Sequence, residues 1–444
     1  MPNKISLKND FPVIEKSNRL YNRALGLIPS ATQTLAKGPG QWVNGVAPKY
    51  LEKGKGSHVW DVDGNEYIDY LMGVGPLSLG YSYPAVDEAI KKQLENGITF
   101  SMMHPLEVEV AELMRDIIPN AEAVRYSKTG ADVTSAAVRL ARAYTNKNKI
   151  LCCGYHGWHD WYIAVTARNH GIPEAVQAIS YTFNYNDIDS VKNSVDDDVA
   201  AIILEPVVFQ EPKDNFLHNL AALCEEKGIV LIFDEMWTGF RMDLGGAQSY
   251  FGITPDLATY SKAVANGMPI SILTGKRKIM DLAENDIFFY TTFGGEALSL
   301  AAVIATVNEI RDKDVIKFLA SQGKRLKEGY NSITSSLGID FTQITGYNWR
   351  SLAVFDDKAG DPLLQKSLMQ QEMIKRGVLW QGFFNMSFSH SDSDVEYTLQ
   401  ALEESLSALK KAVNGNKLKE SLIGLPVQPV FRKVDNFNMK PLKK

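Results

Sequence analysis

Two side chains that could do chemistry stand directly after predicted strands. The aliphatic run 229–233 is followed by Asp234, and the run 257–261 is followed by Lys262. A carboxylate in that place is equally well explained as a helix N-cap, and a lysine there is often only a surface residue. At a buried strand end, however, desolvation favours the neutral amine of a lysine, which makes it a nucleophile able to form a Schiff base.

A third feature could hold an anion. Gly130 and Ala131 follow Thr129 at the start of a segment with helical periodicity, so free backbone N–H groups and the helix dipole would face a phosphate there. An ordinary capped helix explains the same residues as well. Neither a G-x-x-x-x-G-K-[ST] loop nor a G-x-G-x-x-G pattern is present, which argues against ATP and dinucleotides.

An aromatic segment follows another predicted strand. The sequence Gly154-Tyr155-His156-Gly157-Trp158-His159 comes after the aliphatic run 150–153, and its glycines allow a flat ligand to approach the backbone. The pair His156 and His159 at i, i+3 could bind a metal, but no third ligand lies at a suitable spacing. We therefore expect a ring that stacks on a ligand here, and no metal site.

One amine, one carboxylate, one phosphate cup and one aromatic ring are together what pyridoxal 5'-phosphate requires. The aldehyde of this cofactor takes a lysine, its ring nitrogen a carboxylate, its phosphate a helix N-terminus and its ring a stacking partner. These features converge if their strands share one sheet, because open α/β sheets gather ligands at the carboxyl ends of their strands. The sequence therefore predicts a pyridoxal-phosphate site.

Alternating aliphatic runs and helical periodicity supply such a sheet. Between about residues 124 and 262 this alternation is typical of stacked βαβ units. The predicted strands are 150–153, 200–205, 229–234 and 257–261. From Val133 to Tyr144, apolar or small residues recur at i, i+3, i+4, i+7, i+8 and i+11, which predicts one buried helical face. Upstream, an Asp-Gly-Asn turn at 63–65 joins two short strands.

The length of 444 residues suggests two or three folding units. We expect an N-terminal segment of a small α+β domain at 1–75 and a large cofactor-binding α/β domain at 76–330. The rest of the small domain, with a Lys- and Pro-rich tail, is expected at 331–444. Helices are predicted at 362–376 and 393–413 within this last part.

Composition excludes several other classes of protein. The 47 basic and 52 acidic side chains give a formal charge of −5, which does not suit a nucleic-acid binder that works by bulk charge. The longest aliphatic run falls far short of the roughly 18 residues of a membrane span, and the first residues contain no apolar signal region. Cys152, Cys153 and Cys224 are too few for a disulfide framework. We therefore expect a cytoplasmic protein without nucleic-acid or membrane partners.

Several longer motifs resemble those of the class III, fold type I, pyridoxal-phosphate aminotransferases, and most closely the branch of glutamate-1-semialdehyde 2,1-aminomutase. The resemblance runs from about Arg19 to the helix after Ser393. Its most specific motifs are Trp60-Asp61-Val62-Asp63-Gly64-Asn65, Phe233-Asp234-Glu235-Met236-Trp237-Thr238-Gly239-Phe240-Arg241, Gly245-Gly246-Ala247-Gln248 and Thr292-Phe293-Gly294-Gly295. The resemblance implies a large domain with a mostly parallel seven-stranded sheet and a smaller α+β domain built from both chain ends.

The resemblance also implies roles for individual residues. Lys262 would form the Schiff base and carry the proton between the substrate carbon and the cofactor, and Asp234 would pair with the pyridinium nitrogen. Tyr155 would stack on one face of the ring, beside His156, and Met236 would cover the other face.

The same resemblance implies the remaining contacts. Thr129, Gly130 and Ala131 would bind the phosphate, and Thr292 would reach it from a second subunit, which implies a homodimer with shared active sites. Glu205 would lie near the substrate, although a structural acid at a strand end is the alternative.

Three segments depart from the family pattern. Residues 128–133 replace Asn-Ser-Gly-Thr-Glu-Ala, and residues 294–299 replace Gly-Gly-Asn-Pro-Leu-Ala. Residues 30–37 replace the Gly-Gly-Val-Asn-Ser-Pro-Val-Arg stretch of true aminomutases. These differences weaken a role in tetrapyrrole synthesis and leave the cofactor assignment standing.

The primary hypothesis is an aminotransferase that moves an amino group from an amino acid, with glutamate as the expected donor, to an aldehyde or ketone. A sugar acceptor is a narrower suggestion, based on amino-sugar-forming relatives and on the strip Trp380–Asn385. Arg241 and Arg350 are candidates for binding a substrate carboxylate, or for structural ion pairs only. The alternatives are the intramolecular aminomutase and a fold relative that binds the cofactor without catalysis.

Overall fold

The computed structural model describes residues 6–429, which form two compact units. One unit comprises residues 84–316, and the other joins residues 6–83 to residues 317–429. The boundaries between the two units lie after residues 83 and 316, whereas the sequence led us to expect them after residues 75 and 330. The last part of the expected Lys- and Pro-rich tail, residues 430–444, lies outside the described residues.

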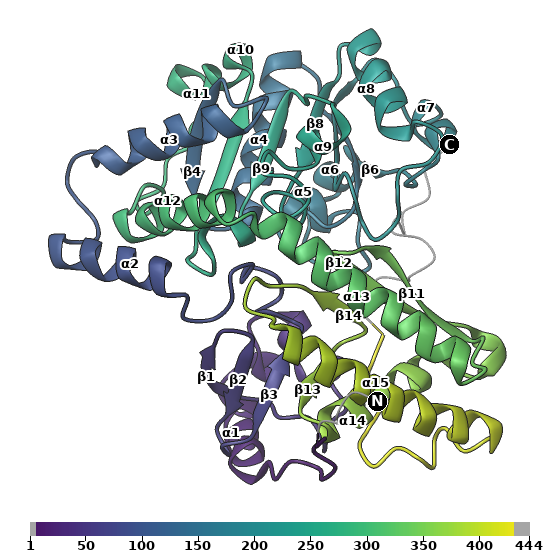
Figure 1. Cartoon of the computed structure of the whole chain (residues 1–444). Helices are drawn as coiled ribbons and strands as arrows, with labels where there is room; N and C mark the ends of the chain where they lie inside the picture. The colour runs from purple at the N-terminus through teal and green to yellow at the C-terminus, as the bar shows by residue number, and fades with distance from the viewer. Residues whose placement is uncertain (1–5, 430–444) are drawn as a thin grey trace. The chain divides into compact units, whose positions relative to one another are not determined.

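A seven-stranded sheet surrounded by helices forms the centre of unit 84–316 (Figure 1). Its strands, in spatial order, are β4 (Ala123–Ser127), β10 (Ser271–Gly275), β9 (Leu257–Tyr260), β8 (Val230–Asp234), β7 (Val199–Leu204), β5 (Lys149–Cys153) and β6 (Ser180–Thr182). Only β10 runs antiparallel to its neighbours. The mostly parallel sheet is confirmed, and the four predicted strands occur with ends that differ by no more than one residue.

The helix predicted from Val133 is α4 (Gly130–Thr145), which packs against β7, β9 and β10. Its apolar face is buried as far as Ala141 and joins the main core of this unit. Tyr144, expected on the same face, is instead exposed, with the amine of Lys278 5.3 Å from its ring centroid. The face ends early because Tyr144 lies in the last turn, where the helix leaves the sheet.

The unit also contains eleven other helical segments among the described residues. They are α2 (Pro84–Asn96), α3 (Pro105–Ile117), α5 (Asp160–Ile163), α6 (Glu174–Gln177), α7 (Ile188–Lys192), α8 (Phe216–Lys227), α9 (Ala247–Phe251), η4 (Lys262–Ala265), α10 (Arg277–Met280), α11 (Leu282–Asn285) and α12 (Ala297–Asp312).

The second unit is built from both ends of the chain, as expected for a small α+β domain. One sheet has the order β1 (Leu51–Lys55), β2 (His58–Asp61), β3 (Glu66–Asp69) and β13 (Val378–Leu379). A second sheet has the order β11 (Thr342–Tyr347), β12 (Arg350–Phe355) and β14 (Phe383–Asn385). The predicted turn joins β2 to β3, and the Asp61 carboxylate accepts hydrogen bonds from the backbone of Asp63 and Asn65.

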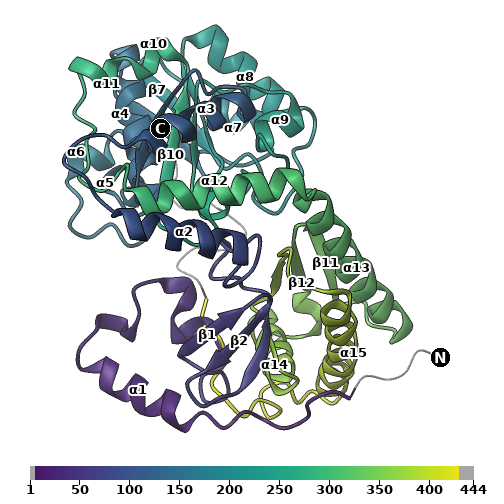
Figure 2. The same ribbon diagram turned by 60° about the vertical axis from the view of Figure 1, so that its left-hand side comes forward.

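Helices complete this unit, with α14 packed beside α15 (Figure 2). They are α1 (Glu15–Leu25), η1 (Pro29–Ala31), η2 (Leu35–Lys37), η3 (Pro39–Gln41), α13 (Val315–Ser336), which spans the division, η5 (Asp357–Ala359), α14 (Pro362–Lys375) and α15 (Asp392–Asn414). The helices predicted at 362–376 and 393–413 are thus confirmed. No helix within residues 6–429 combines the length and the apolar character that crossing a membrane would need.

Candidate active site

A buried acid and a buried imidazole meet at the carboxyl ends of β8 and β5. Nδ1 of His156 lies 2.7 Å from Oδ2 of Asp234, and Nε2 of His156 lies 3.1 Å from the carbonyl oxygen of Cys153. Because a carbonyl oxygen can only accept, Nε2 carries a hydrogen, and the contact between Nδ1 and the carboxylate then needs a second proton shared by the pair. The other carboxylate oxygen of Asp234 accepts from the backbone N–H of Met236. Asp234 is therefore held in one orientation at the strand end.

The start of α4 forms a cup next to this pair. Thr129 is the N-cap: its hydroxyl accepts from the N–H of Asp132, whose carboxylate accepts from the N–H of Thr129. The N–H groups of Gly130 and Ala131 follow, and the first N–H groups of a helix have no acceptor within the helix. The helix is 16 residues long, so its dipole also favours an anion at this end.

Glycines let the surrounding segments approach this cup. A Cβ on Gly157 would lie 2.5 Å from Cβ of Ala131, and Gly157 has a φ of +104° that few other residues adopt. A Cβ on Gly130 would lie 2.9 Å from the sulfur of Met236. The absence of side chains at these two positions therefore brings Met236 and the segment after β5 against the start of α4.

Tyr155 and Glu205 meet beside the Asp234 pair. Glu205, which follows β7, is buried and accepts a hydrogen bond of 2.6 Å from the backbone N–H of Tyr155. The ring of Tyr155 is 44% exposed and packs edge-on against Tyr162. The carboxylate of Glu205 thus orients the backbone that presents the Tyr155 ring, which is a structural role for this strand-end acid.

Lys262 follows β9 as the first residue of η4. Strand β9 pairs in parallel with β8, so the ends that carry Lys262 and Asp234 are neighbours in the sheet. Lys262 has a φ of +44°, a left-handed conformation that costs a non-glycine residue roughly 1–2 kcal/mol. Strain of this kind is concentrated at functional sites.

Trp237 is a site residue that the sequence interpretation did not single out. The amine of Lys262 lies 4.6 Å from the centroid of the Trp237 ring, and the guanidinium of Arg241 lies 5.2 Å from it. Arg241 is buried and donates a hydrogen bond to the carbonyl oxygen of Trp237. Arg241 therefore supports the loop after β8, which favours the structural alternative over binding of a substrate carboxylate. The signal for Trp237 was its place inside the motif 233–241.

Glu235 was also missed, and it anchors this loop. Its buried carboxylate accepts hydrogen bonds from the hydroxyl of Thr238 and from the backbone N–H groups of Ala247 and Gln248. Burial raises the pKa of Glu235 to about 7. Its own N–H donates to the carbonyl oxygen of Thr259 on β9. Glu235 thus ties together the strand ends that carry Asp234 and Lys262.

Thr292, Arg350 and the strip Trp380–Asn385 belong to other segments of the chain. Thr292 is exposed in the turn that precedes α12. Arg350 lies on β12 of the other unit, with its guanidinium 6.0 Å from the Phe383 ring. Trp380 and Phe384 in the strip Trp380–Asn385 are completely buried, so these two rings belong to the core and offer no face to a sugar.

The residues present suit pyridoxal phosphate. A buried carboxylate backed by a proton donor, an amine on a strained strand end, a glycine-lined helix N-terminus and an exposed tyrosine ring all lie within unit 84–316. Over residues 6–429, no group of three or more His, Cys, Asp or Glu side chains is placed to share a metal ion.

Comparison with known proteins agrees with this geometry. Residues 43–346 match the profile of the family "Aminotransferase class-III". The 3-aminobutyryl-CoA aminotransferase of Cloacimonas acidaminovorans (strain Evry) is 35% identical over 414 residues, which are 90% of this chain and 98% of that protein. The glutamate-1-semialdehyde 2,1-aminomutase of Acetivibrio thermocellus is 38% identical over 342 residues, which are 72% of this chain and 80% of that protein.

Solved structures show the same fold. The FumI protein of Sphingopyxis sp. MTA144, determined in its PLP internal aldimine form, is 29% identical, with a TM-score of 0.83 over 90% of this chain and 97% of that chain. The matched family profile covers more than half of the sequence. The chain therefore belongs to the class III aminotransferases, fold type I enzymes whose cofactor is pyridoxal 5'-phosphate.

Proposed function

We propose that this enzyme transfers an amino group from an amino-acid donor, glutamate, to an aldehyde or ketone acceptor. The observation that carries the proposal is the buried pair of Asp234 and His156 at the strand end next to Lys262. A carboxylate that shares a proton in a dry site is the partner that a protonated ring nitrogen requires.

Each residue of the site then has a defined task. When bound, pyridoxal phosphate supplies an electron sink for the carbon that carries the amino group. Asp234, backed by His156, keeps a proton at the ring nitrogen, and the Lys262 amine holds the cofactor and moves a proton at the reacting carbon. The N–H groups of Gly130 and Ala131 bind the phosphate oxygens.

Two further side chains are placed against the cofactor, and two others position residues of the site. The exposed ring of Tyr155 covers one face of the cofactor ring, and Met236 covers the other. The ring of Trp237 lies 4.6 Å from the Lys262 amine and is proposed to position it. Glu205 acts through the backbone of Tyr155 and is proposed as a positioning residue.

We propose that the carbonyl carbon that accepts the amino group is not directly bonded to a free carboxylate. The relative named 3-aminobutyryl-CoA aminotransferase supports this class, since the amino group in that name stands at carbon 3. Arg241 is buried and donates to the carbonyl oxygen of Trp237, which fits a structural role for this arginine. A sugar acceptor stays within the class, but the buried rings of the strip Trp380–Asn385 give it no support.

The intramolecular aminomutase is the second candidate. It is favoured by relatives that carry that name, including the protein of Acetivibrio thermocellus. The replacement of the aminomutase stretch by residues 30–37 weighs against it. The two reactions use the same residues and differ in whether a separate donor is consumed.

The assembly and location are also proposals. Thr292 is proposed to complete the phosphate site of a second subunit, which makes the enzyme a homodimer with shared active sites. A cytoplasmic location is proposed because Cys152, Cys153 and Cys224 are all buried and unbridged within the described chain, as expected in a reducing compartment.

The test is a half-reaction on the purified holoenzyme. With glutamate alone we expect the visible absorbance of the lysine-bound cofactor to disappear and one equivalent of 2-oxoglutarate to form. Lys262→Ala should lose both the visible band and turnover after dialysis. A visible band that persists in dialysed Lys262→Ala would contradict the role of this lysine. Conversion of glutamate-1-semialdehyde without any donor would select the aminomutase instead.

A further inference from the structure

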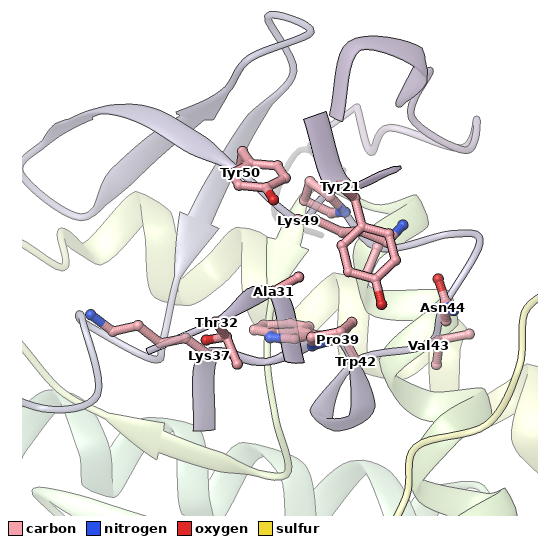
Figure 3. A pocket seen from close by; sticks show the side chains of 12 residues that line it. Tyr21, Ala31, Thr32, Lys37, Pro39, Trp42, Val43, Asn44, Lys49 and Tyr50 are labelled. Carbon is pink, nitrogen blue, oxygen red and sulfur yellow. The ribbon is translucent and has the colours of Figure 1, made fainter. Parts of the chain in front are cut away.

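A pocket in the unit formed by residues 6–83 and 317–429 combines positive charge with aromatic rings (Figure 3). It encloses about 170 Å³, close to the roughly 150 Å³ of a cavity that holds one benzene ring. The side chains that matter are Tyr21, Lys37, Trp42, Asn44, Lys49 and Tyr50. No Asp or Glu side chain lines it. The lining therefore carries two positive charges and no negative one.

Lys49 provides the cation that is held in place. Its backbone N–H donates to the hydroxyl of Ser17, and its amine donates to the side-chain oxygen of Asn18 at 2.7 Å. The amine also lies 5.2 Å from the centroid of the Tyr21 ring. Partial burial lowers the pKa of Lys49, and no carboxylate in the described part of the chain pairs with it. An ammonium group has three donors, so two remain for an anion.

Further polar groups of the pocket are unused. The side-chain amide of Asn44 and the hydroxyls of Tyr21 and Tyr50 make no hydrogen bond with any residue among 6–429. In Figure 3 the rings of Tyr21 and Tyr50 lie on one side, and those of Pro39 and Trp42 lie on the other. Polar groups with free hydrogen-bonding capacity thus lie between rings. We expect such an arrangement in a site that binds a ligand with both an anionic group and a ring.

The floor of the pocket is fixed by the C-terminal segment. Asn44 and Leu425 exchange two backbone hydrogen bonds, and the N–H of Gln428 donates to the carbonyl oxygen of Gly40. Val427 packs in the same core cluster as Trp42. The part of the tail that is described thus has a structural role, because it holds the segment that carries Trp42 and Asn44.

We propose that this pocket binds a nucleotide through its phosphate. Lys49 and Asn44 contact the phosphate oxygens, since lysine binds phosphate as a point charge. The aromatic rings pack against the base or ribose, because aromatic side chains stack on bases of any kind. The enclosed volume accommodates one such group, so the rest of the nucleotide extends towards Lys37, whose side chain points away from the others in Figure 3.

This inference goes beyond the proposed function and needs no turnover for its test. The holoenzyme is titrated calorimetrically with ADP, adenosine and inorganic phosphate, with bound pyridoxal phosphate blocking the cup at α4. We expect ADP to saturate one site per chain, and inorganic phosphate and adenosine to bind more weakly. Lys49→Met should weaken ADP binding by about ten- to a hundredfold, the usual loss for a hydrogen bond to a charged group.

Matched variants complete the design. Lys49→Arg should retain binding within a few-fold, because it keeps the charge. Lys324→Met removes an exposed lysine of α13 that does not line the pocket, and should leave ADP binding unchanged. Asn44→Asp adds a negative charge at nearly constant size, so it should weaken binding even if Lys49→Met does not fold.

Several results would overturn the proposal. These are the absence of saturable ADP binding, equal ADP binding in the wild type and both pocket variants, and adenosine binding as tightly as ADP. Inorganic phosphate binding as tightly as ADP would reject the nucleotide and identify free phosphate as the ligand. None of these results touches transamination, so the proposed function is tested separately.

Discussion

Nδ1 of His156 and Oδ2 of Asp234 are 2.7 Å apart, and neither side chain reaches solvent. The second ring nitrogen of His156 is committed to a carbonyl oxygen of its own segment. The imidazole can therefore act only as a proton-bearing support for the carboxylate. The orientation of the Asp234 carboxylate is thus set by a residue 78 positions earlier in the chain.

Replacing His156 should impair chemistry more than binding. In His156→Ala the buried carboxylate loses its proton partner, and we expect kcat to fall about 10- to 100-fold with the donor KM nearly unchanged. His156→Asn, which can donate one hydrogen bond, should recover part of the loss and shift the pH profile of kcat. The control is His159→Ala, since His159 is partly exposed and bonds Ser135 instead. Equal losses in the His156 and His159 variants would contradict the prediction.

A methyl group at Gly157 should weaken cofactor binding. Gly157→Ala places Cβ 2.5 Å from Cβ of Ala131, so the start of α4 must shift. Gly171 has a similar φ of +91° but no atom within 4 Å of an added Cβ, so Gly171→Ala suffers the backbone strain alone. We expect the Kd of the apoenzyme for pyridoxal phosphate to rise at least about tenfold in Gly157→Ala and to change little in Gly171→Ala, as fluorescence titration would measure. A similar Kd in both variants would show that the cup tolerates the shift.

Subunit mixing tests the proposed role of Thr292. In a dimer with shared sites, a Lys262→Ala subunit still offers an intact Thr292, and a Thr292→Asp subunit still offers an intact Lys262. Unfolding and refolding an equal mixture should therefore restore about a quarter of wild-type activity, since roughly half of the dimers are mixed and each has one intact site. Each variant refolded alone serves as the control. No recovery on mixing would place Thr292 outside the partner's site.

His390 should make stability depend on pH. Burial lowers its pKa to about 4, and the neutral ring accepts from the N–H of Ser387 at Nδ1 and donates to the carbonyl oxygen of Asp69 at Nε2. Between about pH 4 and 6.5 the unfolded chain binds a proton at this position that the folded chain does not. Stability should therefore fall as the pH is lowered from 6.5 to 4, by up to about 3 kcal/mol.

Urea unfolding at pH 7 and at pH 5 measures this effect. His390→Gln is expected to be less stable at pH 7 but to lose less stability on acidification than the wild type. His218→Gln removes an exposed histidine and should keep the wild-type dependence. An unchanged difference between the two pH values in His390→Gln would refute the assignment.

The buried parallel strands could be predicted because a run such as Val199–Leu204 can be accommodated only in the centre of a sheet. Strand β10 was not predicted because its sequence, Ser271–Gly275, mixes hydroxyl and apolar residues, although all five residues are buried. Thr274 is tolerated there because its hydroxyl donates to the side-chain oxygen of Asn120, a contact across more than 150 residues. No local pattern contains that information.

The candidate site shows the same division between local and long-range information. Asp234 and Lys262 were found because each directly follows an aliphatic run. The tasks of Glu235 and Trp237 could not be predicted, because both residues lie in the loop after β8, where no periodic pattern says which way a side chain points and distant segments decide what each contacts. For Glu235 that returning chain is the segment with Ala247 and Gln248.

The pairing of β3 with β13 has a consequence for synthesis on the ribosome. Ile68 lies opposite Val378, so roughly 300 residues must be translated before β3 gains its neighbour. At about 5–20 residues per second this takes some 15–60 s, during which the edge of β3 is open to other nascent chains. The unit of residues 84–316 is contiguous and can fold meanwhile. Chaperone dependence in cells should thus be traced to the first eighty residues.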